Sequence, residues 1–131
     1  MHEKVLGGSL PSPLALAYLG DARHSLYVRH MLVMRGMSKP SDLNRESLGF
    51  VTAASQARMF EKIEPILLDD EREIFKRAFN STHLNKPKSA SGKDYRTATG
   101  FEAVIGMLEW IGDTERLEEL LSLAHGGNKN D

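Results

Sequence analysis

Two acidic residues, Asp21 and Glu102, lie in segments whose apolar residues otherwise recur at helical spacing. Around Asp21, the residues expected on one buried helix face are Leu14, Ala17, Tyr18, Ala22 and Leu32. Around Glu102, they are Ala98, Phe101, Val104, Ile105, Leu108 and Ile111. Because burying a carboxylate is costly unless it is paired, hydrogen-bonded or bound to a metal, each of these partly buried acids needs a partner.

A shared magnesium ion would satisfy both acids at once. If the two helices pack together, Asp21 and Glu102 come close enough to hold one hard cation. Magnesium needs few protein carboxylates, because waters and phosphate oxygens complete its ligands. An internal salt bridge, for example between Asp21 and Arg96, is the competing explanation. The residue pattern alone leaves both explanations open.

A segment between the two acids carries an excess of positive charge. Although the 131-residue chain has a formal net charge of -1, residues 76–96 hold six lysines and arginines against one aspartate. Such a cluster is usually a solvated surface, and contacts with phosphates are the alternative explanation. The candidate phosphate-contacting residues are Arg77, Lys86, Lys88, Lys93 and Arg96.

Composition excludes several other kinds of site. The absence of cysteine rules out disulfides, thiolate metal sites and thiol nucleophiles, and it fits a reducing cytosol. The sequence has no phosphate-binding glycine loop, dinucleotide fingerprint or zinc-binding helix pattern. His24 and His30 are expected at the surface or at helix ends rather than on a metal. With no signal-peptide core and no membrane-spanning apolar stretch, we expect a soluble, cytoplasmic protein without a membrane partner.

The elements that position these residues are predicted to be helices throughout. We expect an all-α fold and a single domain over residues 1–131, with a core of about 12–125 and flexible ends. The expected helices run from Pro13 to Gly36, from about Ser41 to Ser47, from about Phe50 to Ile63, from Asp69 to Asn80, from about Asp94 to Gly112, and from Asp113 or Thr114 to the Gly126–Asp131 tail.

Local signals set the ends of these helices. Ser12 is a good N-cap before Pro13, and glycine at position 36 is a good stop. Pro65 disfavours helical backbone at Glu64 and should bend or break the third helix there. Residues 81–93, which are rich in Asn, Pro, Ser, Gly and Lys, should form an exposed loop that holds most of the positive charge.

Two stretches of the sequence resemble the acidic signatures of ribonuclease III catalytic domains. They are residues 16–22, LAYLGDA, and residues 98–106, ATGFEAVIG. From about Leu14 to Ala124 the chain is more closely similar to Mini-ribonuclease III, the short bacterial branch that lacks a separate double-stranded-RNA-binding domain. Further matching pieces are residues 27–30, 50–53, 56–57, 76–77, 80, 87–88 and 95–96.

This resemblance implies a fold, an activity and partners. It implies the helical bundle of the ribonuclease III endonuclease domain, assembled as a homodimer, and magnesium-dependent hydrolysis of double-stranded RNA to 5′-phosphate products. It further implies maturation of large-subunit (23S) ribosomal RNA as the task. Because no separate RNA-binding domain is present, a ribosomal protein or the tertiary structure of the RNA is expected to present the cleavage site. Asp21 and Glu102 occupy the positions of the family's catalytic, metal-binding acids.

Departures from the family pattern keep other functions open. Ala54 and Phe79 stand where the resemblance leads us to expect a lysine and an arginine, so two cations that could serve RNA binding are absent. One alternative is a non-catalytic module of the same fold that binds double-stranded RNA or assists ribosome assembly. Another is a structural helical dimer for protein partners, which would leave both acids and the basic segment unexplained.

Overall fold

All regular elements in the described part of the chain, residues 9–82 and 92–127 of this computed structural model, are helices. They are α2 (Pro13–Met34), α3 (Pro40–Val51), α4 (Ala53–Ile63), the short 3-10 helix η1 (Glu64–Ile66), α5 (Asp69–Ser81), α6 (Gly92–Ile111) and α7 (Thr114–Ala124). The predicted all-α fold is therefore confirmed. Most of the predicted basic loop, including Lys86 and Lys88, lies outside the described residues.

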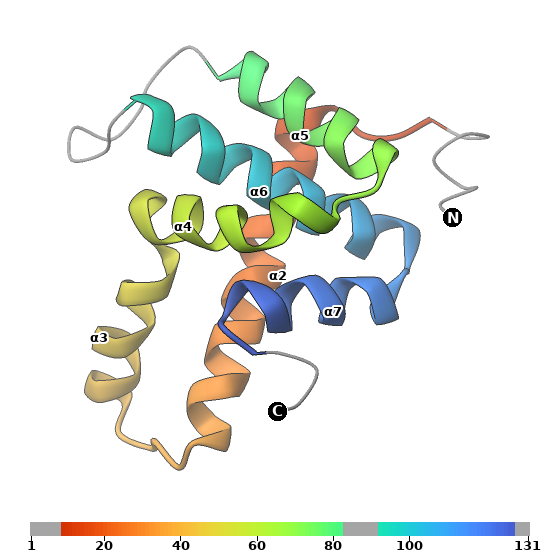
Figure 1. Cartoon of the computed structure of the whole chain (residues 1–131). Coiled ribbons are helices and arrows are strands. Elements are labelled where there is room, and N and C mark those ends of the chain that lie inside the picture. Colours follow the sequence, from red (N-terminus) through yellow and green to blue (C-terminus); the bar gives the residue numbers. More distant parts are fainter. Residues whose placement is uncertain (1–8, 83–91, 128–131) are drawn as a thin grey trace.

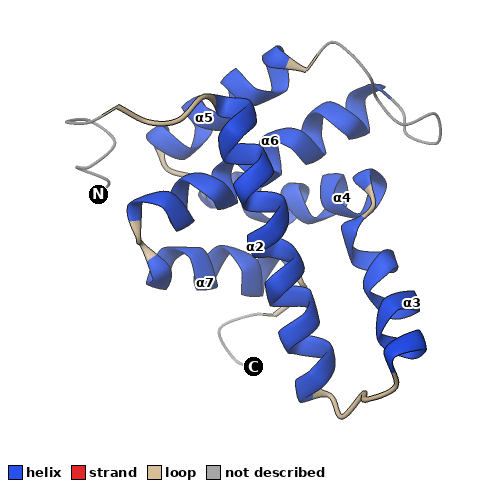
Figure 2. Ribbon diagram, turned by 180° about the vertical axis from the view of Figure 1, so that it is seen from behind, coloured by secondary structure: helices blue, strands red, loops and turns tan. Residues whose placement is uncertain are grey.

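Helix α6 forms the centre of the fold, with α2, α4, α5 and α7 packed around it (Figures 1 and 2). Its sequence explains this position, because apolar and small residues occupy nearly every side of it between Thr97 and Leu108. The six residues predicted to form its buried face are all buried in the structure. Glu102 interrupts this buried stretch and is only partly exposed.

Helix α2 begins and ends where its local signals predict. The Ser12 hydroxyl oxygen accepts a hydrogen bond from the backbone N–H of Ala15 at 3.1 Å, and Gly36 adopts a φ of 92° just after the helix. Of the predicted buried face of this helix, however, only Ala17 and Leu32 are buried. Leu14 is 45% exposed and Tyr18 84% exposed, and the side chain of Ala22 is also exposed.

The face that α2 does bury lies about a quarter turn away. It consists of Leu16, Ala17, Gly20, His24, Val28 and Leu32. This face was missed because it includes a glycine and a histidine, whereas the face first expected has more apolar side chains. Asp21 lies at the border between the two faces and is exposed, so the expectation that it is partly buried is also wrong.

Other helix ends differ from expectation in small, explicable ways. Helix α3 extends to Val51, and the Thr52 hydroxyl caps α4 by accepting from the Ser55 N–H at 3.2 Å. Glu64 keeps helical angles (φ -51°, ψ -45°) despite Pro65, because the chain tightens there into η1, whose first turn tolerates a proline. Leu68, rather than Asp69, is the N-cap of α5.

A buried ion pair joins α5 to α7. The Glu71 carboxylate is fully buried and accepts from the Arg116 guanidinium at 2.8 and 2.9 Å. The same carboxylate accepts from the Leu68 N–H at 2.8 Å, and Arg116 also donates to the Ile66 carbonyl. Because these bonds satisfy the buried anion, the pair has a structural role. Among the residues described, no helix is both long and apolar enough to cross a membrane.

Candidate functional site

Two glycines allow α2 and α6 to cross with their backbones in contact. A Cβ atom built on Gly20 would overlap the carbonyl oxygen of Glu102, and one built on Gly106 would overlap the carbonyl oxygen of Leu16. Any side chain at either position would therefore push the helices apart. Since Asp21 follows Gly20, this close crossing is what brings Asp21 and Glu102 together.

The carboxyl groups of Asp21 and Glu102 lie within hydrogen-bonding distance of each other. Burial, followed by the negative charge of Asp21 and a hydrogen bond with it, raises the pKa of Glu102 to about 8, and a hydrogen bond with Gln56 opposes the shift. Near neutral pH and without a cation, the pair therefore shares a proton. A divalent cation between the two oxygens would replace that proton and relieve the repulsion.

The donor set suits magnesium. Both groups are carboxylates, which are hard oxygen ligands, and one of them faces solvent. No group of three or more His, Cys, Asp and Glu side chains suited to a metal occurs in residues 9–82 and 92–127. An ion held by Asp21 and Glu102 would thus keep most of its coordination positions open to water and to phosphate oxygens.

The competing salt bridge is not seen. Within the described ranges, neither Asp21 nor Glu102 forms an ion pair with a lysine or an arginine. The Arg96 guanidinium, the partner suggested for Asp21, instead lies over the ring of Phe79 at 5.9 Å from its centroid.

The basic candidates that the structure describes gather at one end of the fold. Arg77 is exposed near the end of α5, and Lys93 and Arg96 are exposed in the first turns of α6. Figure 1 shows these two helix ends side by side at the upper left. Arg96 precedes Glu102 by six residues, about 9 Å along the helix axis.

The two positions that depart from the family pattern have different settings. Ala54 is exposed in the first turn of α4. Phe79 is partly buried beneath Arg96, with its ring centroid 5.8 Å from that of Phe75. The Phe79 ring therefore packs against the Arg96 guanidinium, and position 79 itself carries no positive charge.

Three polar residues close to the acid pair were missed by the sequence analysis. His24 was expected at the surface or at a helix end, but it is fully buried, and so is Gln56 of α4. His125, at the C-terminal end of α7, lies against His24. The one local signal for His24 is its place four residues after Gly20, on the face that meets α6.

Comparisons with known proteins agree with this architecture. Residues 14–113 match the family described as the ribonuclease III domain. The chain is 42% identical to Mini-ribonuclease 3 of Streptococcus pneumoniae, over 87% of this chain and 91% of that protein. It is 41% identical to Mini-ribonuclease 3 of Symbiobacterium thermophilum, over 86% of each.

A solved structure shares the fold as well. The crystal structure of protein FN1578 from Fusobacterium nucleatum is 32% identical to this chain, with a TM-score of 0.76, covering 85% of this chain and 88% of that one. The resemblance noted in the sequence is thereby confirmed. The chain belongs to the ribonuclease III domain family, a family of endoribonucleases, and within it to the Mini-ribonuclease 3 group.

Proposed function

We propose that this protein is a magnesium-dependent endoribonuclease that hydrolyses phosphodiester bonds of double-stranded RNA. The observation that carries the proposal is the meeting of Asp21 and Glu102 at the α2–α6 crossing, where burial and mutual repulsion raise the pKa of Glu102. Structural packing alone would favour an apolar pair at this point. Two carboxylates pressed together are instead a typical site for a divalent cation.

In this reaction the residues of the protein would have separate roles. Asp21 and Glu102 would hold the metal, with Asp21 on the solvent side, from which RNA approaches. When bound, magnesium would supply an activated water and neutralise charge on the scissile phosphate. The basic residues Arg77, Lys93 and Arg96, together with Lys86 and Lys88, would contact backbone phosphates, through which duplex RNA is mainly recognised.

A homodimer fits the exposed apolar row on α2. Leu14, Tyr18 and Leu26 are 45%, 84% and 58% exposed, and Ala22 stands between them at the same spacing of four residues. This row borders Asp21. A two-fold pairing of the row with its copy would bury these side chains and place two acid pairs in one particle, one for each RNA strand.

The biological substrate we propose is a precursor of 23S ribosomal RNA, cut in the cytoplasm. This part of the proposal is supported by membership of the Mini-ribonuclease 3 group. A ribosomal protein that presents the RNA would compensate for the modest number of basic residues around the site.

Ala54 and Phe79 favour one second candidate, a non-catalytic module that binds double-stranded RNA. Without cations at these positions, the protein would hold RNA less firmly in the cutting register. Such a module, however, would have no need of two carboxylates in contact.

Incubation of one sequence as a duplex and as a single strand separates the candidates. With magnesium, the duplex should be cut to products with 5′-phosphates while the single strand stays intact, and EDTA should prevent all cutting. Salt-sensitive duplex binding without any cutting would support the binding module instead.

A further inference from the structure

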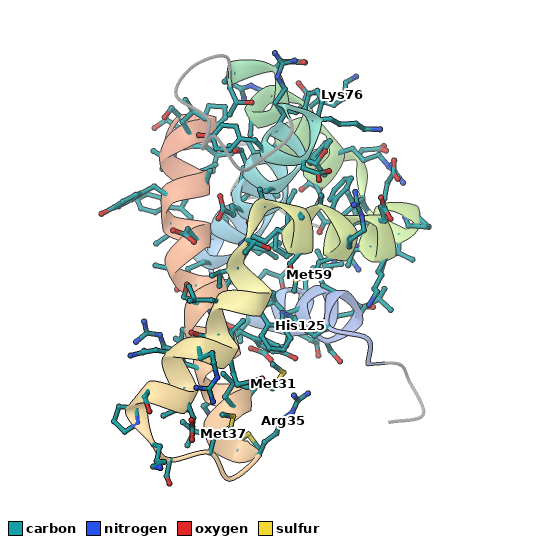
Figure 3. The ribbon with its side chains drawn as sticks, turned by 90° about the vertical axis from the view of Figure 1, so that its left-hand side faces the viewer. Met31, Arg35, Met37, Met59, Lys76 and His125 are labelled. Atoms are coloured by element: carbon teal, nitrogen blue, oxygen red, sulfur yellow. The ribbon has the colours of Figure 1, made fainter. Side chains whose placement is uncertain are left out.

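A series of polar side chains leads away from Glu102, of which Gln56 and His24 are buried and His125 is partly buried. The Gln56 side chain hydrogen-bonds to the Glu102 carboxylate. Its Nε2 atom lies 3.2 Å from Nδ1 of His24, and Nε2 of His24 lies 2.9 Å from Nε2 of His125. Figures 1 and 3 show how this is possible, since the C-terminal end of α7, with His125, reaches α2. Helices α4 and α2 and the end of α7 thus converge on one carboxylate of α6.

With one proton on each histidine ring, the hydrogen bonds of this series can all run in the same direction. Burial lowers the pKa of His24 to about 3, with the charge of His125 as a smaller cause, and burial also lowers the pKa of His125 to about 4. Both rings are therefore neutral near pH 7, and each carries one proton. If Gln56 donates to Nδ1 of His24, then His24 donates from Nε2 to His125. The second N–H of the Gln56 amide is then free to donate to Glu102.

Aromatic packing holds both rings in place. The His24 ring meets Phe101, the residue before Glu102, edge to face at 5.3 Å between centroids. The His125 ring lies 5.0 Å from the ring of Tyr27 and 5.5 Å from that of Phe50. Nδ1 of His125 is buried and has no hydrogen-bond partner in the described structure. The aromatic contacts therefore leave the two rings little freedom to turn.

We propose that Gln56 is a positioning residue for Glu102, and that His24 and His125 act behind it to fix the direction of its amide. Buried polar groups are costly, and an apolar core at the same place would stabilise the fold more simply. The series of Gln56, His24 and His125 instead ends on the Glu102 carboxylate, which the proposed function assigns to the metal. The inference therefore rests on that function. Groups that orient a metal ligand change metal affinity or activity by about 10-fold to 100-fold when they are removed.

Manganese binding by the full chain, followed by electron paramagnetic resonance without RNA, tests the proposal. Gln56→Met, which keeps the side-chain length, should weaken Mn²⁺ binding by about 10-fold or more. His24→Phe, which keeps the ring packing, should weaken it by several-fold. His24→Asn should recover most of the loss, because its side-chain oxygen stands near the position of Nδ1 and can accept from Gln56. On duplex RNA, the variants should lower kcat and leave KM unchanged.

A matched control separates positioning from general loss of stability. Glu71→Gln breaks the buried ion pair with Arg116, so it should lower the melting temperature while Mn²⁺ affinity stays as in the wild type. If Gln56→Met does not fold, the two His24 variants test the same statement, since both keep Gln56.

The outcomes that contradict the proposals differ. If Asp21→Asn and Glu102→Gln lose Mn²⁺ while Gln56→Met and His24→Phe bind it normally, the positioning role is overturned and the chain is structural. If Asp21→Asn and Glu102→Gln also bind Mn²⁺ normally, the metal assignment falls, and the positioning role falls with it.

Discussion

At the scale of single residues, the raised pKa of Glu102 links metal binding to the loss of a proton. Below a pH of about 8 the carboxyl group of Glu102 holds a proton in the metal-free protein. A cation must displace this proton before it gains both carboxylates as ligands. The proximity of Asp21 therefore sets the pH range in which the site fills, as well as supplying a ligand.

In the metal-free protein, Glu102→Gln should raise the free energy of unfolding near pH 8 relative to the wild type. Because the pKa of Glu102 rises from 4.5 in the unfolded chain to about 8 in the folded protein, the wild type loses stability as pH rises through this window. Glutamine carries no charge, so the variant avoids that loss. Urea unfolding in EDTA at several pH values should show the gain disappear towards pH 5. A difference that stays constant with pH would contradict the shifted pKa.

The pairing of Asp21 with Glu102 was predicted because each acid stands in a largely apolar helical segment, although Asp21 proved to be exposed rather than partly buried. The hydrogen-bonded series behind them, Gln56, His24 and His125, could not be predicted from the sequence. Gln56 and His24 are 32 residues apart, and His24 and His125 are 101 apart, so no local pattern joins them. The partner of a polar side chain inside an apolar segment can be identified only when the packing of the helices is known.

At the scale of elements, local signals predicted the helix ends well, and packing decided what they could not. Ser12 and Gly36 mark the ends of α2 through contacts with adjacent residues. The buried face of α2 depends instead on where α6 crosses it. That crossing is set by Gly20, which adds nothing to hydrophobic periodicity, so Tyr18 was wrongly expected inside.

The α2–α6 crossing can be tested with alanine. Gly20→Ala should destabilise the protein by about 1–3 kcal/mol or more and abolish cleavage, because the new Cβ would overlap the Glu102 carbonyl oxygen and separate the acids. Gly49→Ala is the matched control, since a Cβ there meets no atom within 4 Å and alanine favours the helix. Thermal unfolding and cleavage rates measure both variants. Equal stability and equal cleavage rates for Gly20→Ala and Gly49→Ala would contradict the claim that backbone contact between α2 and α6 brings Asp21 and Glu102 together.

At the scale of the whole molecule, the proposed dimer depends on the exposed row of α2. Tyr18→Asp should convert a dimer into a monomer, because it places a charge in the centre of the buried row. With Tyr18 84% exposed in the single chain, the monomer should keep its melting temperature and helical content. Sedimentation velocity gives the oligomeric state. A monomeric wild type, or a dimer that survives the substitution, would contradict the proposed interface.

The two carboxylates at the α2–α6 crossing give the most direct test of the proposed nuclease. The measurement is magnesium-dependent cleavage of a long RNA duplex by the wild type, Asp21→Asn and Glu102→Gln, with duplex binding and circular dichroism recorded on the same samples. We predict that both variants stay folded, still bind the duplex, and lose cleavage by several orders of magnitude. Near-normal cleavage by either folded variant would contradict the assignment of Asp21 and Glu102 as the catalytic metal ligands.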